Sequence, residues 1–225
     1  MKIRHGRTFT VLEVMIASAI LMTMIGMAMV VSAETGQNVG DTLAISDTAL
    51  RSNRVAADLN LYLRSAQEYV LSPTATGYTQ NTAAQFRSIL GYDFDGKDSD
   101  GVTDNNGVSR SPVRLIRFVY DAGETGNGAD DDGDGLIDEG RLELCEDANN
   151  NGSAADSGET LMTFATDVQA SSLNFQILPS FGSTPIANTD CALQISFTLL
   201  KRLPSNGQTY TYTQTVDIAF RNRLD

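Results

Sequence analysis

Apolar and polar positions divide the chain into a long apolar segment near its start and a polar, alternating remainder. Residues 14–33 form an uninterrupted run of twenty uncharged positions. As a helix this run is about 30 Å long, which matches the hydrocarbon core of a bilayer. The basic residues Lys2, Arg4 and Arg7 precede it, and the positive-inside rule keeps them in the cytoplasm. The pattern therefore predicts one transmembrane helix, with the rest of the chain on the far side of the membrane.

A secretory signal peptide is the competing interpretation of this segment. Val31-Ser32-Ala33 has the small residues of a cleavage site. Glu13, however, places a carboxylate at the start of the apolar run, which costs roughly a few kcal/mol in lipid. A signal peptide has no use for such a charge, so the sequence favours a retained helix.

Helical periodicity continues past the apolar segment, with polar interruptions. We predict an amphipathic continuation over residues 34–72, ended by Ser72-Pro73. Gly36 and Gly40 each weaken a helix by about 1 kcal/mol, which predicts a bend or a frayed turn there. The apolar face of this continuation consists of Leu59, Leu63, Ala66 and Val70.

The second part of the chain alternates between apolar and polar residues, as half-buried strands do. The predicted strands are 113–120, 141–145, 160–165, 172–178, 192–200 and 209–220. Pro204 and Asn206-Gly207 predict a hairpin between the last two strands. A long helix followed by antiparallel strands predicts an α+β fold, in which residues 73–225 form a β-rich head and the helix packs on the sheet.

Charge is concentrated in two insertions of this head. The chain carries 16 basic and 28 acidic residues, a net charge of −12. Residues 121–160 hold 13 of the acids against one base, and residues 93–104 hold five more against one base. We therefore expect acidic loops at 91–107 and 121–160 in an otherwise mildly basic protein. Such an acidic chain is not expected to bind nucleic acid, because phosphate backbones require cationic contacts.

Composition also argues against most enzymes. His5, in the basic leader, is the only histidine of the chain, which excludes a Ser–His or Cys–His nucleophile pair and a His-rich zinc site. An acid hydrolase with paired carboxylates has little support, because acids in Gly-rich loops are not held at a fixed separation. We expect a protein without catalytic activity.

The loop at 121–160 begins with the ligand spacing of a calcium loop. Positions 1, 3, 5, 7 and 9 of that pattern are Asp130, Asp132, Asp134, Leu136 (through its carbonyl) and Asp138. Gly135 stands at position 6, where a sharp turn is needed. Position 12 is Arg141 rather than glutamate, so Glu139 or Glu143 would have to replace it with a different loop geometry. We predict a Ca²⁺ loop without the EF-hand fold, since no long helices flank it.

Two further segments fit parts of the same pattern. The second has Asp147, Asn149 and Asn151 at alternate positions, and the third has Asp98, Asp100 and Asp104. The second resembles the D-x-N-x-N-G loops of bacterial extracellular proteins. The alternative is that Asp, Asn and Gly only make solvated turns. Thirteen acids within forty residues repel each other unless counterions intervene, which favours Ca²⁺ binding.

Cys145 and Cys191 are the two cysteines of the chain, and both lie in the part expected outside the cytoplasm. Oxidation is permitted there, which predicts a disulfide bond between them. Two buried free thiols are the alternative.

The start of the chain carries a more specific signal. The residues Phe9-Thr10-Val11-Leu12-Glu13-Val14-Met15-Ile16-Ala17 resemble the class III signal of type IV pilins and type II secretion pseudopilins. That family has a short basic leader, a Gly, then Phe-Thr-Leu-x-Glu and about twenty apolar residues. In the family, a prepilin peptidase cuts before the Phe and N-methylates it, and the Glu pairs with the free amine of a neighbouring subunit.

For this chain, the resemblance implies cleavage between Thr8 and Phe9 and assembly through Glu13. A buried carboxylate requires a cationic partner, which fits this role. Thr8 stands where the family has Gly, so an uncleaved, merely anchored protein remains an alternative. The expected organisation is a basic leader at 1–8, a transmembrane and polymerisation helix at 9–33, its continuation at 34–72 and the head at 73–225.

The end of the chain is similar to the larger minor pilins (W-type) and to J-type minor pseudopilins. Their closing pattern of a Val-x-x-Leu-x-Phe strand, a variable loop and a Thr-rich hairpin corresponds to residues 168–175, 193–200 and 209–222. The resemblance implies a pilin-like minor subunit of a type IV pilus or type II secretion pseudopilus. It would cross the bacterial inner membrane once, with its head in the periplasm at or near the filament tip. Its partners would be other subunits and the prepilin peptidase. A membrane-anchored or secreted Ca²⁺-dependent binding or cell-adhesion module is the alternative function.

Overall fold

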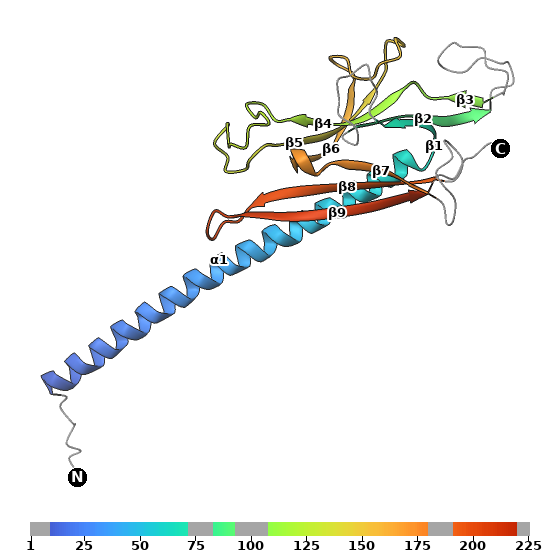
Figure 1. The fold of residues 1–225 in the computed structure, drawn as a ribbon. Helices are drawn as coiled ribbons and strands as arrows, with labels where there is room; N and C mark the ends of the chain where they lie inside the picture. The colour runs from blue at the N-terminus through green and yellow to red at the C-terminus, as the bar shows by residue number, and fades with distance from the viewer. Residues whose placement is uncertain (1–9, 72–82, 93–107, 180–190, 220–225) are drawn as a thin grey trace.

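The computed structural model describes residues 10–71, 83–92, 108–179 and 191–219. This part of the chain contains one long helix followed by an antiparallel sheet of nine strands, the expected α+β order (Figure 1). The helix is α1 (Val11–Leu63), and a short 3₁₀ turn is η2 (Ala170–Ser172). The strands are β1 (Ala66–Leu71), β2 (Ala83–Tyr92), β3 (Val108–Arg110), β4 (Arg114–Tyr120), β5 (Glu139–Glu146), β6 (Thr160–Gln169), β7 (Asn174–Pro179), β8 (Cys191–Arg202) and β9 (Thr209–Ala219).

Helix α1 begins with a capping box. The Thr10 hydroxyl accepts a hydrogen bond from the N–H of Glu13 at 3.2 Å, and the Glu13 carboxylate accepts one from the N–H of Thr10 at 2.9 Å. These bonds satisfy amides that have no partner within the helix. Glu13, expected to face a neighbouring amine, thus caps its own helix in the single chain.

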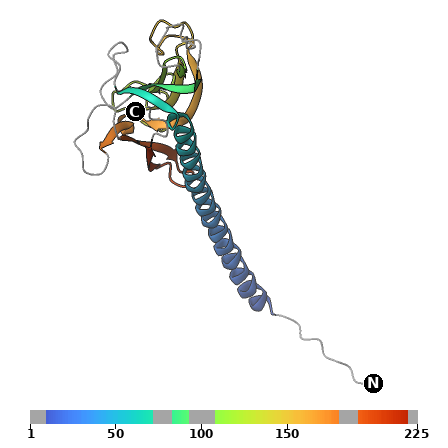
Figure 2. The same ribbon diagram turned by 90° about the vertical axis from the view of Figure 1, so that its right-hand side faces the viewer.

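The N-terminal half of α1 projects away from the head and is uncovered (Figure 2). It contains a window of mean hydropathy 2.4, none of it buried, so this helix is long and apolar enough to cross a membrane. A membrane anchor and a signal sequence would both have this property. At 53 residues the helix is about 80 Å long. The frayed turn expected as one option at Gly36 and Gly40 is not found, because α1 continues through both glycines.

The C-terminal end of the helix also differs from the expectation. Helix α1 ends at Leu63, nine residues before Ser72-Pro73. Ala66 and Val70 lie in β1 instead of on the apolar helical face, because this segment pairs antiparallel with β2. The buried residues of α1 are Thr48, Ser52, Val55, Leu59 and Leu63. This face packs against β9, β8 and β6.

The sheet is curled and has the strand order β1-β2-β4-β5-β6-β8-β7, with β3 beside β2 and β9 beside β8. Strand β8 is shared: β9 pairs with it along one edge from Ala192 to Arg202, whereas β7 and β6 meet its other edge. The six strands predicted from alternation are confirmed as β4 to β9, with slightly different ends, and so is the hairpin between β8 and β9. Strands β1, β2 and β3 were not predicted.

The core lies between the sheet and the second half of α1. The inward face of β8 consists of Leu193, Ile195, Phe197 and Leu199, all buried as the alternation predicted. These side chains belong to one cluster with Leu59 of α1. At the rim, Arg51 of α1 contacts Asp167 at 3.1 Å and the Thr166 hydroxyl at 2.9 Å, which fixes the helix to the end of β6.

Candidate metal centre in the acidic loop

The loop between β4 and β5, residues 121–138, folds its acidic side chains through short-range hydrogen bonds. The Asp130 carboxylate accepts from the N–H groups of Gly133 and Gly135 at 2.7 and 2.9 Å. Both glycines have positive φ, 86° and 94°, a conformation that favours glycine. The Asp132 carboxylate accepts from the N–H of Asp134 at 3.0 Å, and that of Asp134 from the N–H of Leu136 at 2.8 Å. The carboxylates at alternate positions thus stabilise the turns of the loop.

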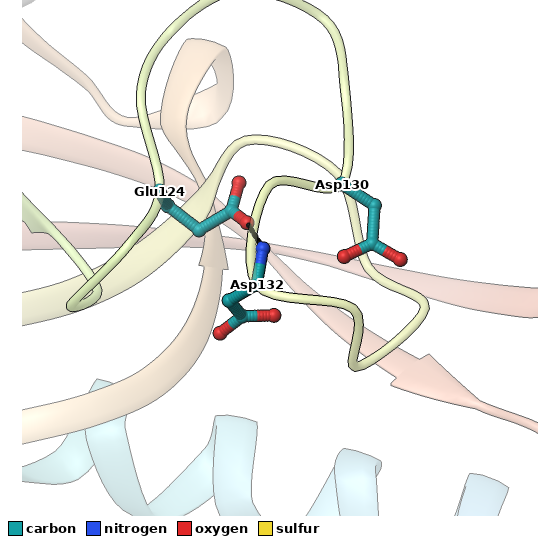
Figure 3. A group of neighbouring side chains, drawn as sticks. All are labelled: Glu124, Asp130 and Asp132. Carbon is teal, nitrogen blue, oxygen red and sulfur yellow. Dashed lines mark hydrogen bonds between the residues drawn. The ribbon is translucent and has the colours of Figure 1, made fainter.

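Two glutamates complete a carboxylate cluster with these aspartates. Oxygen atoms of Glu124, Asp130 and Asp132 lie within 4.8 Å of one another, and so do those of Asp132, Asp134 and Glu139. Asp132 belongs to both groups and therefore joins them. Figure 3 shows Glu124, Asp130 and Asp132 around one side of the loop. Such groups could hold a metal ion.

Glu124 is held by the loop backbone and is 5% exposed. Its Oε1 accepts from the N–H groups of Asp131 and Asp132 at 2.8 and 3.0 Å. Its Oε2 has no hydrogen-bond partner within the described part of the chain. Glu124 also lines an open pocket of about 1130 Å³, together with residues of β4, η2 and β9.

Glu139 is the first residue of β5 and only 1% exposed. Neither of its carboxylate oxygens has a hydrogen-bond partner among the described residues. Burial raises the pKa of Glu139 to about 7, and the negative charges of Asp134, Glu124 and Asp132 act in the same direction. A buried carboxylate without a partner is costly unless it is protonated or meets a cation.

The ion pairs between described residues do not involve this cluster. None of the ion pairs among residues 10–71, 83–92, 108–179 and 191–219 includes Glu124, Asp130, Asp132, Asp134 or Glu139. Arg202 is close, but its guanidinium donates to the backbone carbonyl of Asp134 at 2.9 Å rather than to a carboxylate. The unpartnered oxygens of Glu124 and Glu139, beside the carboxylates of the three aspartates, fit a hard divalent cation, which prefers oxygen ligands.

Two other positions of the predicted calcium loop, the ninth and the twelfth, make contacts outside the carboxylate cluster. Asp138 has φ 50°, and its carboxylate accepts from the N–H groups of Asn127 and Gly128 at 3.0 Å, outside the cluster. Arg141, at the twelfth position, pairs with Glu143 at 2.5 Å and with Asp121 at 3.3 Å. Since Glu143 is already engaged, Glu139 is the acid that can replace the missing glutamate.

The second acidic loop, residues 147–159, is closed by its own hydrogen bonds. Asp147 accepts from the N–H groups of Asn151 and Gly152 at 3.1 and 2.8 Å. The side-chain amides of Asn149 and Asn151 donate to Asp156 at 3.1 and 2.6 Å. These partners account for the loop without an ion, so its Ca²⁺ site stays a prediction. The third expected site, at Asp98, Asp100 and Asp104, lies outside the described residues, as do Thr8 and Phe9.

The expected disulfide bond has no support in the structure. Cys145 is a buried free thiol, and burial raises its pKa. The side chain of Cys191 lies outside the described residues. Strands β5 and β8 run in the same direction, because both are antiparallel to β6. Val168 of β6 pairs with Gly140 of β5 on one side and with Leu199 of β8 on the other, so Gly140 and Leu199 lie at the same level of the sheet. Cys145 follows that level and Cys191 precedes it, so they lie toward opposite ends of the two strands.

Sequence reasoning missed Glu124 as a candidate ligand and left Glu139 as one of two options. Glu124 lies six residues before Asp130, outside the calcium-loop pattern that begins at Asp130. Only the fold of residues 121–130 brings its carboxylate close to Asp130 and Asp132. The comparisons with known proteins add no candidate ligand: no family model, no curated protein and no solved structure matches this chain.

Proposed function

We propose that this protein is a minor pilin or pseudopilin, a noncatalytic structural subunit of a type IV pilus or type II secretion pseudopilus. The observation that carries the proposal is the form of α1. Its apolar N-terminal half is uncovered and has Glu13 in its first turn, whereas its C-terminal half packs on an antiparallel sheet. The residues around Phe9 add the processing signal described above.

The exposed half of α1 requires an apolar environment. Large apolar side chains from Val11 to Val31 are about half to four-fifths exposed, and water disfavours such a surface. The inner membrane would hold this half before assembly, and the helices of other subunits would cover it in the filament. Glu13 would then exchange its bonds to Thr10 for the amine of a neighbouring, cleaved subunit.

The head of this subunit would bind Ca²⁺. The free carboxylate oxygens of Glu124 and Glu139 support this ion identity, because Ca²⁺ accepts six to eight oxygen ligands in flexible geometry.

Two variants of the first helical turn test filament membership. Glu13→Gln removes the charge but keeps a side chain that can complete the capping box. Thr10→Ala removes the hydroxyl cap and keeps the charge. We expect Glu13→Gln to reduce incorporation into filaments at least tenfold and Thr10→Ala to leave it near wild type, as measured by immunoblotting of sheared filaments from the native organism.

Mass spectrometry of the amino terminus provides the companion measurement. A mature chain that begins at Phe9 and is N-methylated supports the proposal. An intact Met1, or a start just after Ala33, together with normal localisation of Glu13→Gln, contradicts it. That outcome favours an anchored or secreted Ca²⁺-dependent binding module.

A further inference from the structure

We propose that Asp132, Asp134 and Glu139 hold a divalent cation, beside an adjoining group of Glu124 and Asp130 that shares Asp132, and that the bound ion fixes the head to α1 where the helix leaves it. This inference rests on the Ca²⁺ binding proposed for the head, but not on filament membership. It names ligands that the loop pattern alone does not assign, and it gives the ion a mechanical role.

The first step is the ion itself. Carboxylate oxygens of Asp132, Asp134 and Glu139 lie within 4.8 Å of one another, and those of Glu124, Asp130 and Asp132 form a second such group. Both buried oxygens of Glu139 and the Oε2 of Glu124 have no hydrogen-bond partner among the described residues. Glu139 is fixed in β5, where its backbone carbonyl accepts from the N–H of Asp121 at 3.3 Å. Glu124 is fixed to the loop through the amides of Asp131 and Asp132. A cation held by Asp132, Asp134 and Glu139 would therefore join the loop to the edge of the sheet.

The second step connects the loop to the hairpin between β8 and β9. The backbone carbonyl of Asp134 accepts from the Arg202 guanidinium at 2.9 Å, and that of Gly135 from the Thr209 hydroxyl at 3.5 Å. Arg202 and Thr209 are the last paired residues before the hairpin turn. Both acceptor carbonyls belong to the segment that the ion would order, so their positions depend on the ion.

The third step connects the hairpin turn to α1. Ser205 donates its N–H to the Asp41 carboxylate at 3.1 Å, and its hydroxyl donates to the second oxygen of the same carboxylate. Pro204 lies beside Gly40, 3.8 Å from the point where a side chain of residue 40 would begin. Every described residue of α1 before Gly40 is exposed. The hairpin turn is therefore the contact of the head that lies nearest to the membrane segment.

These three steps form a continuous path from the ion to the helix. With the ion bound, the loop holds Arg202, Arg202 holds the hairpin turn, and Ser205 holds Asp41. Without it, repulsion among the carboxylates loosens the loop and removes two acceptors from the hairpin. Ca²⁺ would thus set how rigidly the head is attached to its stalk.

The experiment uses the full chain in detergent micelles. Isothermal titration calorimetry with CaCl₂ measures binding, and hydrogen exchange with and without Ca²⁺ measures protection of residues 203–208 and 34–45. We expect Ca²⁺ to slow exchange in both segments at least fivefold. Glu139→Gln and Glu124→Gln should each weaken binding at least tenfold, whereas Asp138→Asn, which removes the same charge from the same loop, should bind normally.

The Arg202→Gln variant separates Ca²⁺ binding in the loop from its effect on the hairpin turn between β8 and β9. It should keep the Ca²⁺ affinity and lose the Ca²⁺-dependent protection of the hairpin turn. Circular dichroism confirms that each variant is folded. Binding that is undetectable, or equally weak in Asp138→Asn, overturns the site. If the wild-type chain binds Ca²⁺ but the hydrogen exchange of residues 203–208 does not change, the proposed link between the ion and the hairpin turn is wrong. Neither result bears on filament membership, which the Glu13→Gln and Thr10→Ala variants test separately.

Discussion

Glu139 lies at the start of a strand, yet its carboxylate faces the acidic loop rather than solvent. The sequence did not show whether Glu139 or Glu143 replaces the glutamate missing at position 12 of the calcium-loop pattern, because both follow the loop closely. The choice depends on Arg141, which pairs with Glu143 at 2.5 Å and so engages that carboxylate. The aspartates were predictable because their alternate spacing is local. Glu124 was not, because its approach depends on how the whole loop folds back.

The pKa of Glu139 gives a pH prediction for the ion-free protein. This pKa is about 7 in the folded chain against an ordinary value of 4.5, so the folded state holds the proton more tightly. The free energy of unfolding should therefore fall as pH rises from about 4.5 to about 7 and level off above. The acids that face Glu139 and contribute are Asp134, Glu124 and Asp132. Urea denaturation in EDTA at pH 5 and pH 8 measures the effect.

Glu139→Gln provides the control for this prediction, because it removes the titrating proton. The variant should show a smaller difference in stability between pH 5 and pH 8 than the wild type. Saturating Ca²⁺ should likewise reduce the difference. A wild-type chain that is equally stable at both pH values in EDTA would contradict the assignment.

At the scale of secondary-structure elements, the sequence predicted those strands whose residue pattern is visible within the strand and its turn. Strands β4 to β9 were found because their residues alternate and the β8–β9 turn contains Asn206-Gly207. Strand β1 was taken for helix because Ala66 and Val70 continue the helical spacing of Leu63. Its extended form comes from pairing with β2, a partner that follows an 11-residue gap outside the described residues. A partner distant in sequence leaves no sign in the segment itself.

The packing of α1 on the sheet can be tested with two neighbouring leucines. Leu59 is 0% exposed and lies in the core, whereas Leu61 is 71% exposed on the same turn of the helix. Leu59→Ala should lower the free energy of unfolding by about 2–5 kcal/mol, because it removes buried surface and leaves a cavity. Leu61→Ala should change it by less than about 0.5 kcal/mol. Urea denaturation in detergent compares them, and equal effects would contradict this packing.

The whole molecule consists of an apolar stalk and an acidic head, two parts with different solvent requirements. The stalk segment is readable from composition alone, since it contains no charge over residues 14–33. The structure of the head could be predicted only in part, because its acidic loops hold many more acidic than basic residues and the sequence does not show how that charge is compensated. The candidate Ca²⁺ loops at 121–138 and 147–159 have similar sequence patterns, and amides donate to the aspartates of both. Only the first leaves buried carboxylate oxygens, those of Glu124 and of the adjoining Glu139, without a partner among the described residues.

Removal of the ion should therefore destabilise the head as a unit. A ligand present at 100 times its dissociation constant adds about 2.7 kcal/mol to the folded state, which corresponds to roughly 5–10 °C in melting temperature for a chain of this size. We expect a Ca²⁺-dependent rise of that order in differential scanning fluorimetry of the full chain. Mg²⁺ should produce a smaller rise, because it retains its water ligands more strongly. An unchanged melting temperature in excess EDTA would contradict ion binding.

The uncovered stretch of α1 just before Asp41 also determines how the molecule responds to pulling. Residues 34–39 are exposed and include Gly36, with Gly40 next to them. Glycine weakens a helix by about 1 kcal/mol, so this stretch yields before the packed part of α1 under axial tension. Stretching six residues from about 1.5 Å to about 3.3 Å each adds roughly 11 Å. In the filament proposed above, each subunit would therefore act as a short spring between its apolar segment and its head, and a pulled filament would lengthen before any head came away.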